Sequence, residues 1–187
     1  MINIFVGLFF IFFRTNISFF DVGIIFYVTN VIGYISLFFG IKELSITNEK
    51  LNKIQPYVVV MMVHSFVFLL LDAFKISPLH IGLINSYTEF LALVGLVFIV
   101  AGMLMIFVII FQLLDGFTDQ FDAAMSTKLL YNLTTVMLFT SILAVVSSIF
   151  NIIPIVEQSL TGLLSLVNVL FLISYYRAFL VKKVKLT

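Results

Sequence analysis

The sequence predicts an all-α fold, a polytopic transmembrane helical bundle with six spans. Hydrophobic residues make up 63% of the 187 residues and charged residues only 10%, with a mean hydropathy of +1.25. Soluble domains are about half apolar and about a quarter charged. Apolar runs long enough to cross a hydrocarbon core of about 30 Å recur along the chain, with short polar stretches between them. We therefore expect one membrane domain over residues 1–187.

The first apolar run is the shortest. Ile2 to Phe13 forms about 18 Å of helix at 1.5 Å per residue, which is less than the thickness of the hydrocarbon core. We expect the helix to continue at a slant to Phe20, with the side chain of Arg14 reaching the interface. The alternative is that the run re-enters the membrane and returns, which leaves five spans. It lacks a basic start and a small-residue cleavage site, so we do not expect a removable signal peptide.

The other apolar runs are long enough to span. Including the first, the predicted spans cover residues 2–20, 24–41, 57–74, 90–114, 129–153 and 160–180. The charged stretch Lys42–Gln55 is expected to form a short amphipathic helix along the interface. Residues 75–89 and the acidic stretch 115–128 are expected to be connectors.

Basic residues divide unequally between the two sides of this topology. Two lie on one side, Arg14 and Lys75, and eight on the other, Lys42, Lys50, Lys53, Lys128, Arg177, Lys182, Lys183 and Lys185. Lys and Arg concentrate in cytoplasmic loops. The asymmetry predicts that both termini face the cytoplasm, and the abundance of Phe, Ile and Asn fits an AT-rich bacterial genome. The expected location is a bacterial cytoplasmic membrane, multi-pass, N-in and C-in.

The composition excludes several function classes. The chain has no Cys, which removes disulfides, thiolate catalysis and Cys-based metal sites. A net charge of +1 gives no reason to expect nucleic acid as a partner. No phosphate-binding loop, H-E-x-x-H or nucleophile-elbow motif is present. We assign no catalytic residue, no metal and no cofactor from the sequence.

Small residues mark faces where helices can approach closely. Gly33, Ser36 and Gly40 are spaced by three and four, so they share one helical face. Because lipid is as apolar as Leu, small residues are typical of helix–helix contacts in membranes. Gly95 and Gly102 repeat the seven-residue spacing in the fourth span. We interpret these faces as packing surfaces, with a glycine-lined solute passage as the alternative.

The same stretch carries a family resemblance. The run from Asn30 to Ser45 resembles a motif of small, uncharacterised polytopic membrane proteins of low-GC Gram-positive bacteria. The matching positions are Asn30, Ile32, Gly33, Tyr34, Gly40, Leu44 and Ser45. Thr29 stands where that motif has a proline. The resemblance implies a multi-pass fold and no particular activity.

His64 is the most costly residue of the predicted third span, because ionisable groups at mid-membrane are rare and usually face a partner inside the bundle. Asp72 lies eight residues further, about 12 Å along a helix, on the same broad face. His64 is either a proton-linked or ligand-contacting group or a neutral histidine bonded to a neighbouring helix.

Two groups of charges lie at the predicted membrane surfaces. On the outer side Asp72, Lys75, His80 and Glu89 are candidates for binding a charged ligand or for catalysis, or they cap helix ends in water. On the inner side Asp115, Asp119 and Asp122 are interpreted as a solvated acidic loop, with a divalent-cation site as the alternative.

The last two predicted spans carry polar residues that form a seam. Its members are Asn132, Thr140, Ser147, Ser148, Asn151, Thr161, Ser165, Asn168 and Tyr175. Such side chains hydrogen-bond between helices in membranes. A polar seam is also able to line a water-filled cavity.

These patterns favour a non-catalytic integral membrane protein: a small transporter, a solute-binding subunit or a component of a membrane complex. The first alternative is a regulatory or immunity-type protein that binds another membrane protein. The second is an intramembrane lipid-modifying enzyme that uses His64 and Asp72. The expected partners are the lipid bilayer and either a small solute or another membrane protein.

Overall fold

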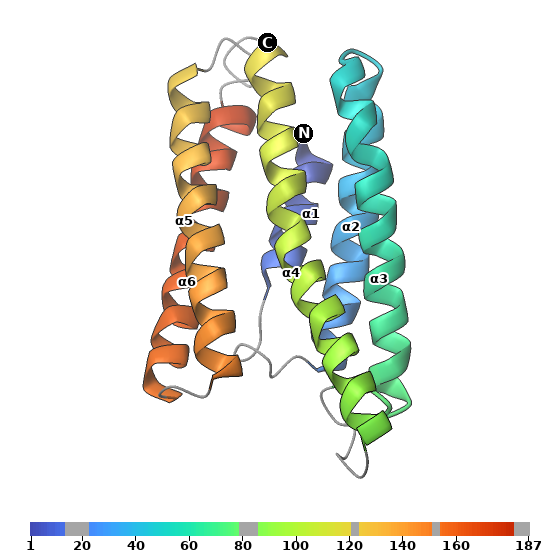
Figure 1. Cartoon of the computed structure of the whole chain (residues 1–187). Coiled ribbons are helices and arrows are strands. Elements are labelled where there is room, and N and C mark those ends of the chain that lie inside the picture. The colour runs from blue at the N-terminus through green and yellow to red at the C-terminus, as the bar shows by residue number, and fades with distance from the viewer. Residues whose placement is uncertain (14–22, 79–85, 121–123, 151–153, 182–187) are drawn as a thin grey trace.

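The computed structural model describes residues 1–13, 23–78, 86–120, 124–150 and 154–181, and every regular element within them is helical (Figure 1). The α-helices are α1 (Ile2–Phe12), α2 (Ile24–Ser45), α3 (Gln55–Ala73), α4 (Ser86–Gln120), α5 (Ala124–Ile149) and α6 (Pro154–Tyr175). A 3₁₀ helix, η1 (Glu49–Ile54), precedes α3, and a π-helical stretch, η2 (Tyr176–Val181), follows α6. The predicted all-α bundle is confirmed.

Five of the helical segments are long and apolar enough to cross a membrane. They cover Ile24–Ser45, Glu49–Ala73, Ser86–Thr118, Thr127–Ile149 and Ile155–Val181. Their outward faces carry large exposed apolar side chains, which on α3 include Val60, Val63 and Phe66. Apolar surface on this scale is typical of a protein surrounded by lipid. The chain is a multi-pass membrane protein.

Helix α1 is shorter than the sequence predicts. It ends at Phe12, because the backbone of Phe13 is extended, with φ −70° and ψ 117°. Its 11 residues do not reach across a hydrocarbon core, so the continuous helix predicted to Phe20 is wrong. The helix ends where the apolar run ends, next to Arg14 in the sequence. Residues 14–22 lie outside the described part of the chain, so crossing and re-entry both stay predictions.

Helices α1 and α2 pack against each other through glycines. A Cβ atom on Gly7 would lie 2.8 Å from the Gly33 carbonyl oxygen, and one on Gly40 would lie 2.8 Å from the Ile4 backbone nitrogen. The Ser36 hydroxyl donates a hydrogen bond of 2.8 Å to the carbonyl of Asn3. Since Ile4 lies beside Gly40 and Gly7 beside Gly33, the two helices are antiparallel. The glycine contacts with α1 extend along α2 from Gly33 to Gly40.

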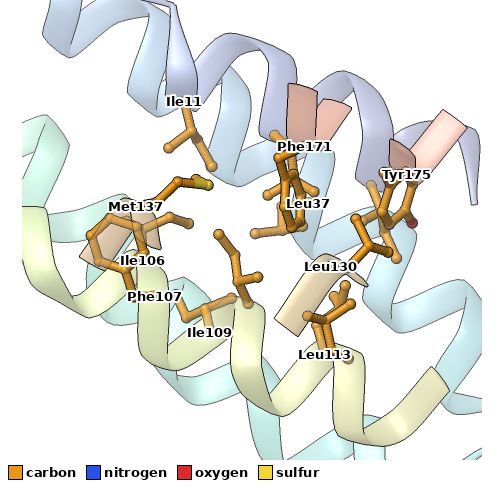
Figure 2. Close-up of a cluster of buried hydrophobic side chains, with 14 of the residues drawn as sticks. Ile11, Leu37, Ile106, Phe107, Ile109, Leu113, Leu130, Met137, Phe171 and Tyr175 are labelled. Carbon is orange, nitrogen blue, oxygen red and sulfur yellow. The ribbon is translucent and has the colours of Figure 1, made fainter. Parts of the chain in front are cut away.

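A buried hydrophobic core joins all six α-helices (Figure 2). Ile11 of α1 and Leu37 of α2 meet side chains of α4 in this cluster, and α5 and α6 contribute Met137 and Phe171. Leu37 and Phe171 are fully buried. Helix α1 is therefore part of the core.

Several predicted boundaries shift. Helix α4 runs from Ser86 to Gln120, so Glu89 and Asp115 lie on a helix and not in the connectors predicted at 75–89 and 115–128. Helix α5 starts at Ala124 and α6 at Pro154, five and six residues before the predicted spans. The predicted spans follow the apolar runs, but a helix continues into water because its backbone bonds are internal.

Candidate functional site

A polar cavity of about 70 Å³ lies at the centre of the bundle. All six α-helices contribute to its walls. The polar residues that line it are Tyr27, Asn30 and Tyr34 of α2, His64 and Ser65 of α3, Ser141 of α5 and Asn168 of α6. The volume exceeds the 10–15 Å³ or so that one water molecule needs.

The end of α1 lies at the cavity. Ile11 and Phe12, at the C-terminal end of α1, form one wall of the cavity. The small-residue face of α2 from Gly33 to Gly40 is covered by α1, whereas Tyr27 and Asn30 lie nearer the start of α2 and face the cavity.

His64 is the middle residue of α3, nine residues from Gln55 and nine from Ala73. Its Nε2 lies 3.0 Å from the carbonyl oxygen of Phe98 on α4. Because a carbonyl only accepts, Nε2 carries a proton in this hydrogen bond and donates it. The imidazole also lies 4.6 Å from the Phe68 ring, centroid to centroid. A Cβ on residue 102 would collide with the imidazole, so Gly102 makes the room that His64 occupies.

Two polar atoms of cavity-lining residues have no hydrogen-bond partner among the described residues. They are the Tyr27 hydroxyl and the Asn168 Oδ1. The two side chains are only 3% and 7% exposed. Leaving a buried polar group unpaired costs about 1–3 kcal/mol. Each atom exposes less than 1 Å² in the structure, and both belong to residues of the cavity wall, so a rotation of either side chain would bring its polar atom to a guest in the cavity.

The charged residues singled out in the sequence do not line this cavity. Asp72 interacts electrostatically with Tyr27 from the last turn of α3, but it is not part of the cavity wall. Glu89 is exposed on the first turn of α4, and Lys75 follows the end of α3. His80 lies outside the described residues. Within the described ranges, no group of three or more His, Asp or Glu side chains is placed to hold a metal ion.

The residues of the predicted polar seam lie in different surroundings. Thr161 and Ser165 donate to carbonyls of their own helix, those of Glu157 and Thr161, at 2.9 and 3.0 Å. Asn132 is exposed, Asn151 lies outside the described residues, and Thr140 and Ser147 are buried in α5. Of the seam residues, only Asn168 lines the cavity.

The remaining glycines and the acidic stretch have separate places. A Cβ on Gly95 would collide with Pro78, so this glycine packs against the segment that follows α3. The Asp115 carboxylate accepts a hydrogen bond from the Tyr131 hydroxyl of α5. Asp122 lies outside the described residues.

Sequence reasoning missed four residues that matter here: Gly7, Tyr27, Ser65 and Ser141. Tyr27, Asn30 and Tyr34 are spaced by three and four, which places them on one face of α2 beside the glycine face. That spacing was a usable signal. Ser65 and Ser141 had none, because an isolated serine in an apolar helix is common at packing contacts.

The fold and the cavity together define an all-α multi-pass membrane protein with a polar site buried among its helices. Comparison of the chain with known protein families, with curated proteins and with solved structures finds no match.

Proposed function

We propose that this chain is a non-catalytic protein of a bacterial cytoplasmic membrane that binds a small, uncharged, hydrogen-bonding solute in its central cavity. It acts as a small transporter or as the solute-binding subunit of one. The observation that carries the proposal is the pair of unpartnered polar atoms, the Tyr27 hydroxyl and the Asn168 Oδ1, in the buried wall of that cavity.

The lining supports an uncharged solute. None of the described lining residues is an Asp, Glu, Lys or Arg. A charged solute would lose its hydration without gaining an opposite charge, which costs several kcal/mol per ion. Phe12, Phe26 and Phe107 form apolar walls around the hydrogen-bonding groups, which is typical of small-molecule sites. The volume of about 70 Å³ restricts the solute to a few heavy atoms.

The proposed orientation is N-in and C-in. Lys42, at the end of α2, and Lys50 and Lys53, on η1, lie at the end of the bundle where the chain enters α3. The Asn48 side chain donates to the Gly116 carbonyl near the end of α4, so the basic loop and the last turns of α4 share this end (Figure 1). The positive-inside rule assigns this end to the cytoplasm.

An intramembrane enzyme is less well supported. General acid–base catalysis requires its groups within hydrogen-bond reach of one reacting site. Asp72 does not line the cavity with His64, and eight residues of helix separate the two by about 12 Å. The Nε2 of His64 donates to the Phe98 carbonyl.

Permeation through proteoliposomes tests the proposal. Glycerol and urea are the probes, and stopped-flow light scattering reports the rate at which each crosses the membrane. We expect wild-type vesicles to pass at least one probe faster than empty vesicles, and Asn168→Leu to remove most of the difference. Asn132→Leu is the matched control, because Asn132 is exposed and lies outside the cavity wall. Equal permeation by both variants, or none above empty vesicles for wild type, would contradict the proposal.

A further inference from the structure

A second hollow lies at the basic end of the bundle, between η1, the start of α3 and the last turns of α4. It is an open groove of about 830 Å³. The polar residues along it are Lys50, Lys53, Tyr57, Gln112, Asp115. The groove is separate from the central cavity, since no residue lines both.

The two lysines lie on a well-anchored element. They are three residues apart on a 3₁₀ helix, which has three residues per turn, so both side chains leave from the same face. Leu51 and Ile54 of the same helix are buried. The Asn48 Nδ2 donates a hydrogen bond of 2.8 Å to the Gly116 carbonyl and fixes η1 to α4.

The described lining of the groove carries two ammonium groups, those of Lys50 and Lys53, and one carboxylate. That carboxylate, Asp115, accepts a hydrogen bond from Tyr131. Gln112 lies three residues further into the membrane along α4, and its buried Oε1 has no partner among the described residues.

The groove also continues onto the lipid-facing surface. Its wall includes Tyr57 and Val60 of α3, and Val60 is 59% exposed. An occupant therefore has access from the bilayer, with its polar part among the lysines and its apolar part along α3. This combination fits an amphiphile better than a free anion in water.

We propose that this groove binds the headgroup of an anionic phospholipid from the inner leaflet. The phosphate lies between the ammonium groups of Lys50 and Lys53, the Gln112 amide contacts the polar glycerol region, and the acyl chains follow Tyr57 and Val60. Basic pockets at the cytoplasmic ends of membrane helices attract anionic lipids, and each Lys near the surface adds to that attraction.

Thermal unfolding of the full-length protein in detergent, followed by far-UV circular dichroism, tests this proposal. The probes are dioleoylphosphatidylglycerol, dioleoylphosphatidylcholine and inorganic phosphate. We expect phosphatidylglycerol alone to raise the midpoint of unfolding, by about 5 °C at saturation. The double variant K50Q/K53Q should lose at least half of this shift.

The double variant K42Q/K128Q is the matched control. Lys42 and Lys128 are exposed, lie outside the groove, and carry the same total charge. This control should keep the wild-type shift. Equal loss in both double variants would overturn the proposal in favour of unspecific charge attraction. An equal shift with inorganic phosphate would overturn it in favour of a free anion, and an equal shift with phosphatidylcholine would exclude selection for an anionic headgroup.

Discussion

At the centre of α3, the His64 ring fills space that any side chain on residue 102 would need. The close approach of the two helices at this point lets His64 donate to the Phe98 carbonyl of α4. The polar group most costly in a membrane span is therefore positioned by the smallest residue of the neighbouring helix. The position of the His64 ring therefore depends on the glycine at residue 102.

Replacing that glycine should destabilise the protein. We expect Gly102→Ala to lower the free energy of unfolding by about 1–3 kcal/mol, the usual cost of overpacking. The measurement is unfolding by SDS in mixed micelles, followed by circular dichroism. Gly162→Ala is the control, because a Cβ there has no neighbour within 4 Å. If His64→Ala does not reduce the cost of Gly102→Ala in a double-mutant cycle, the proposed contact is wrong.

At the scale of elements, α1 is a half-length helix fixed to α2 by glycines on both sides of the contact. The packing face predicted on α2, with Gly33 and Gly40, lies against α1. On α1, Gly7 packs against this face, and it belongs to the apolar run that was predicted as the first span. The length of α1 was not predictable from the apolar pattern, because Phe19 and Phe20 extend that pattern past Arg14. The hydroxyls of Thr161 and Ser165 donate to carbonyls of their own helix and not to a neighbouring helix. The spacing of these residues in the sequence does not distinguish the two kinds of hydrogen bond.

Enlarging the glycine contact should separate these two helices. We expect Gly33→Val to destabilise the fold by about 1–3 kcal/mol, because its Cβ would lie 2.6 Å from the Ile11 Cγ1 and 2.9 Å from the Gly7 carbonyl oxygen. The same SDS titration measures the effect. Gly23→Ala, where no atom lies within 4 Å of the added Cβ, should change stability little. Comparable losses in both variants would show that the α1–α2 contact does not carry the effect.

For the whole molecule, composition and apolar run length were enough to predict the all-α membrane bundle, because lipid permits few other backbone arrangements. They did not predict the cavity. A cavity depends on which helix faces meet, and Asn30, Ser65, Ser141 and Asn168 come from four different helices. His64 was identified because a histidine in an apolar run is conspicuous in any sequence.

The orientation of the whole molecule is directly testable because the chain has no cysteine. We expect Ile76→Cys to react with a membrane-impermeant maleimide in intact cells, and Ile46→Cys to react only after permeabilisation. Both side chains are exposed, near opposite ends of α3; Lys42, Lys50 and Lys53 lie at the Ile46 end, against Lys75 at the Ile76 end. Labelling of Ile46→Cys in intact cells would reverse the proposed topology.

Cysteine reactivity within α3 tests most directly whether a cavity with polar side chains in its wall lies inside the bundle. Ser65 lines the cavity, so Ser65→Cys would place a thiol in its wall. Val63, two residues earlier, is 57% exposed on the outward face of α3, so Val63→Cys would place a thiol toward the lipid. Thiols react as thiolates, which form in water and not in hydrocarbon. We expect a small water-soluble methanethiosulfonate to modify Ser65→Cys at least about ten times faster than Val63→Cys. Equal rates, or a faster reaction at Val63→Cys, would contradict this expectation.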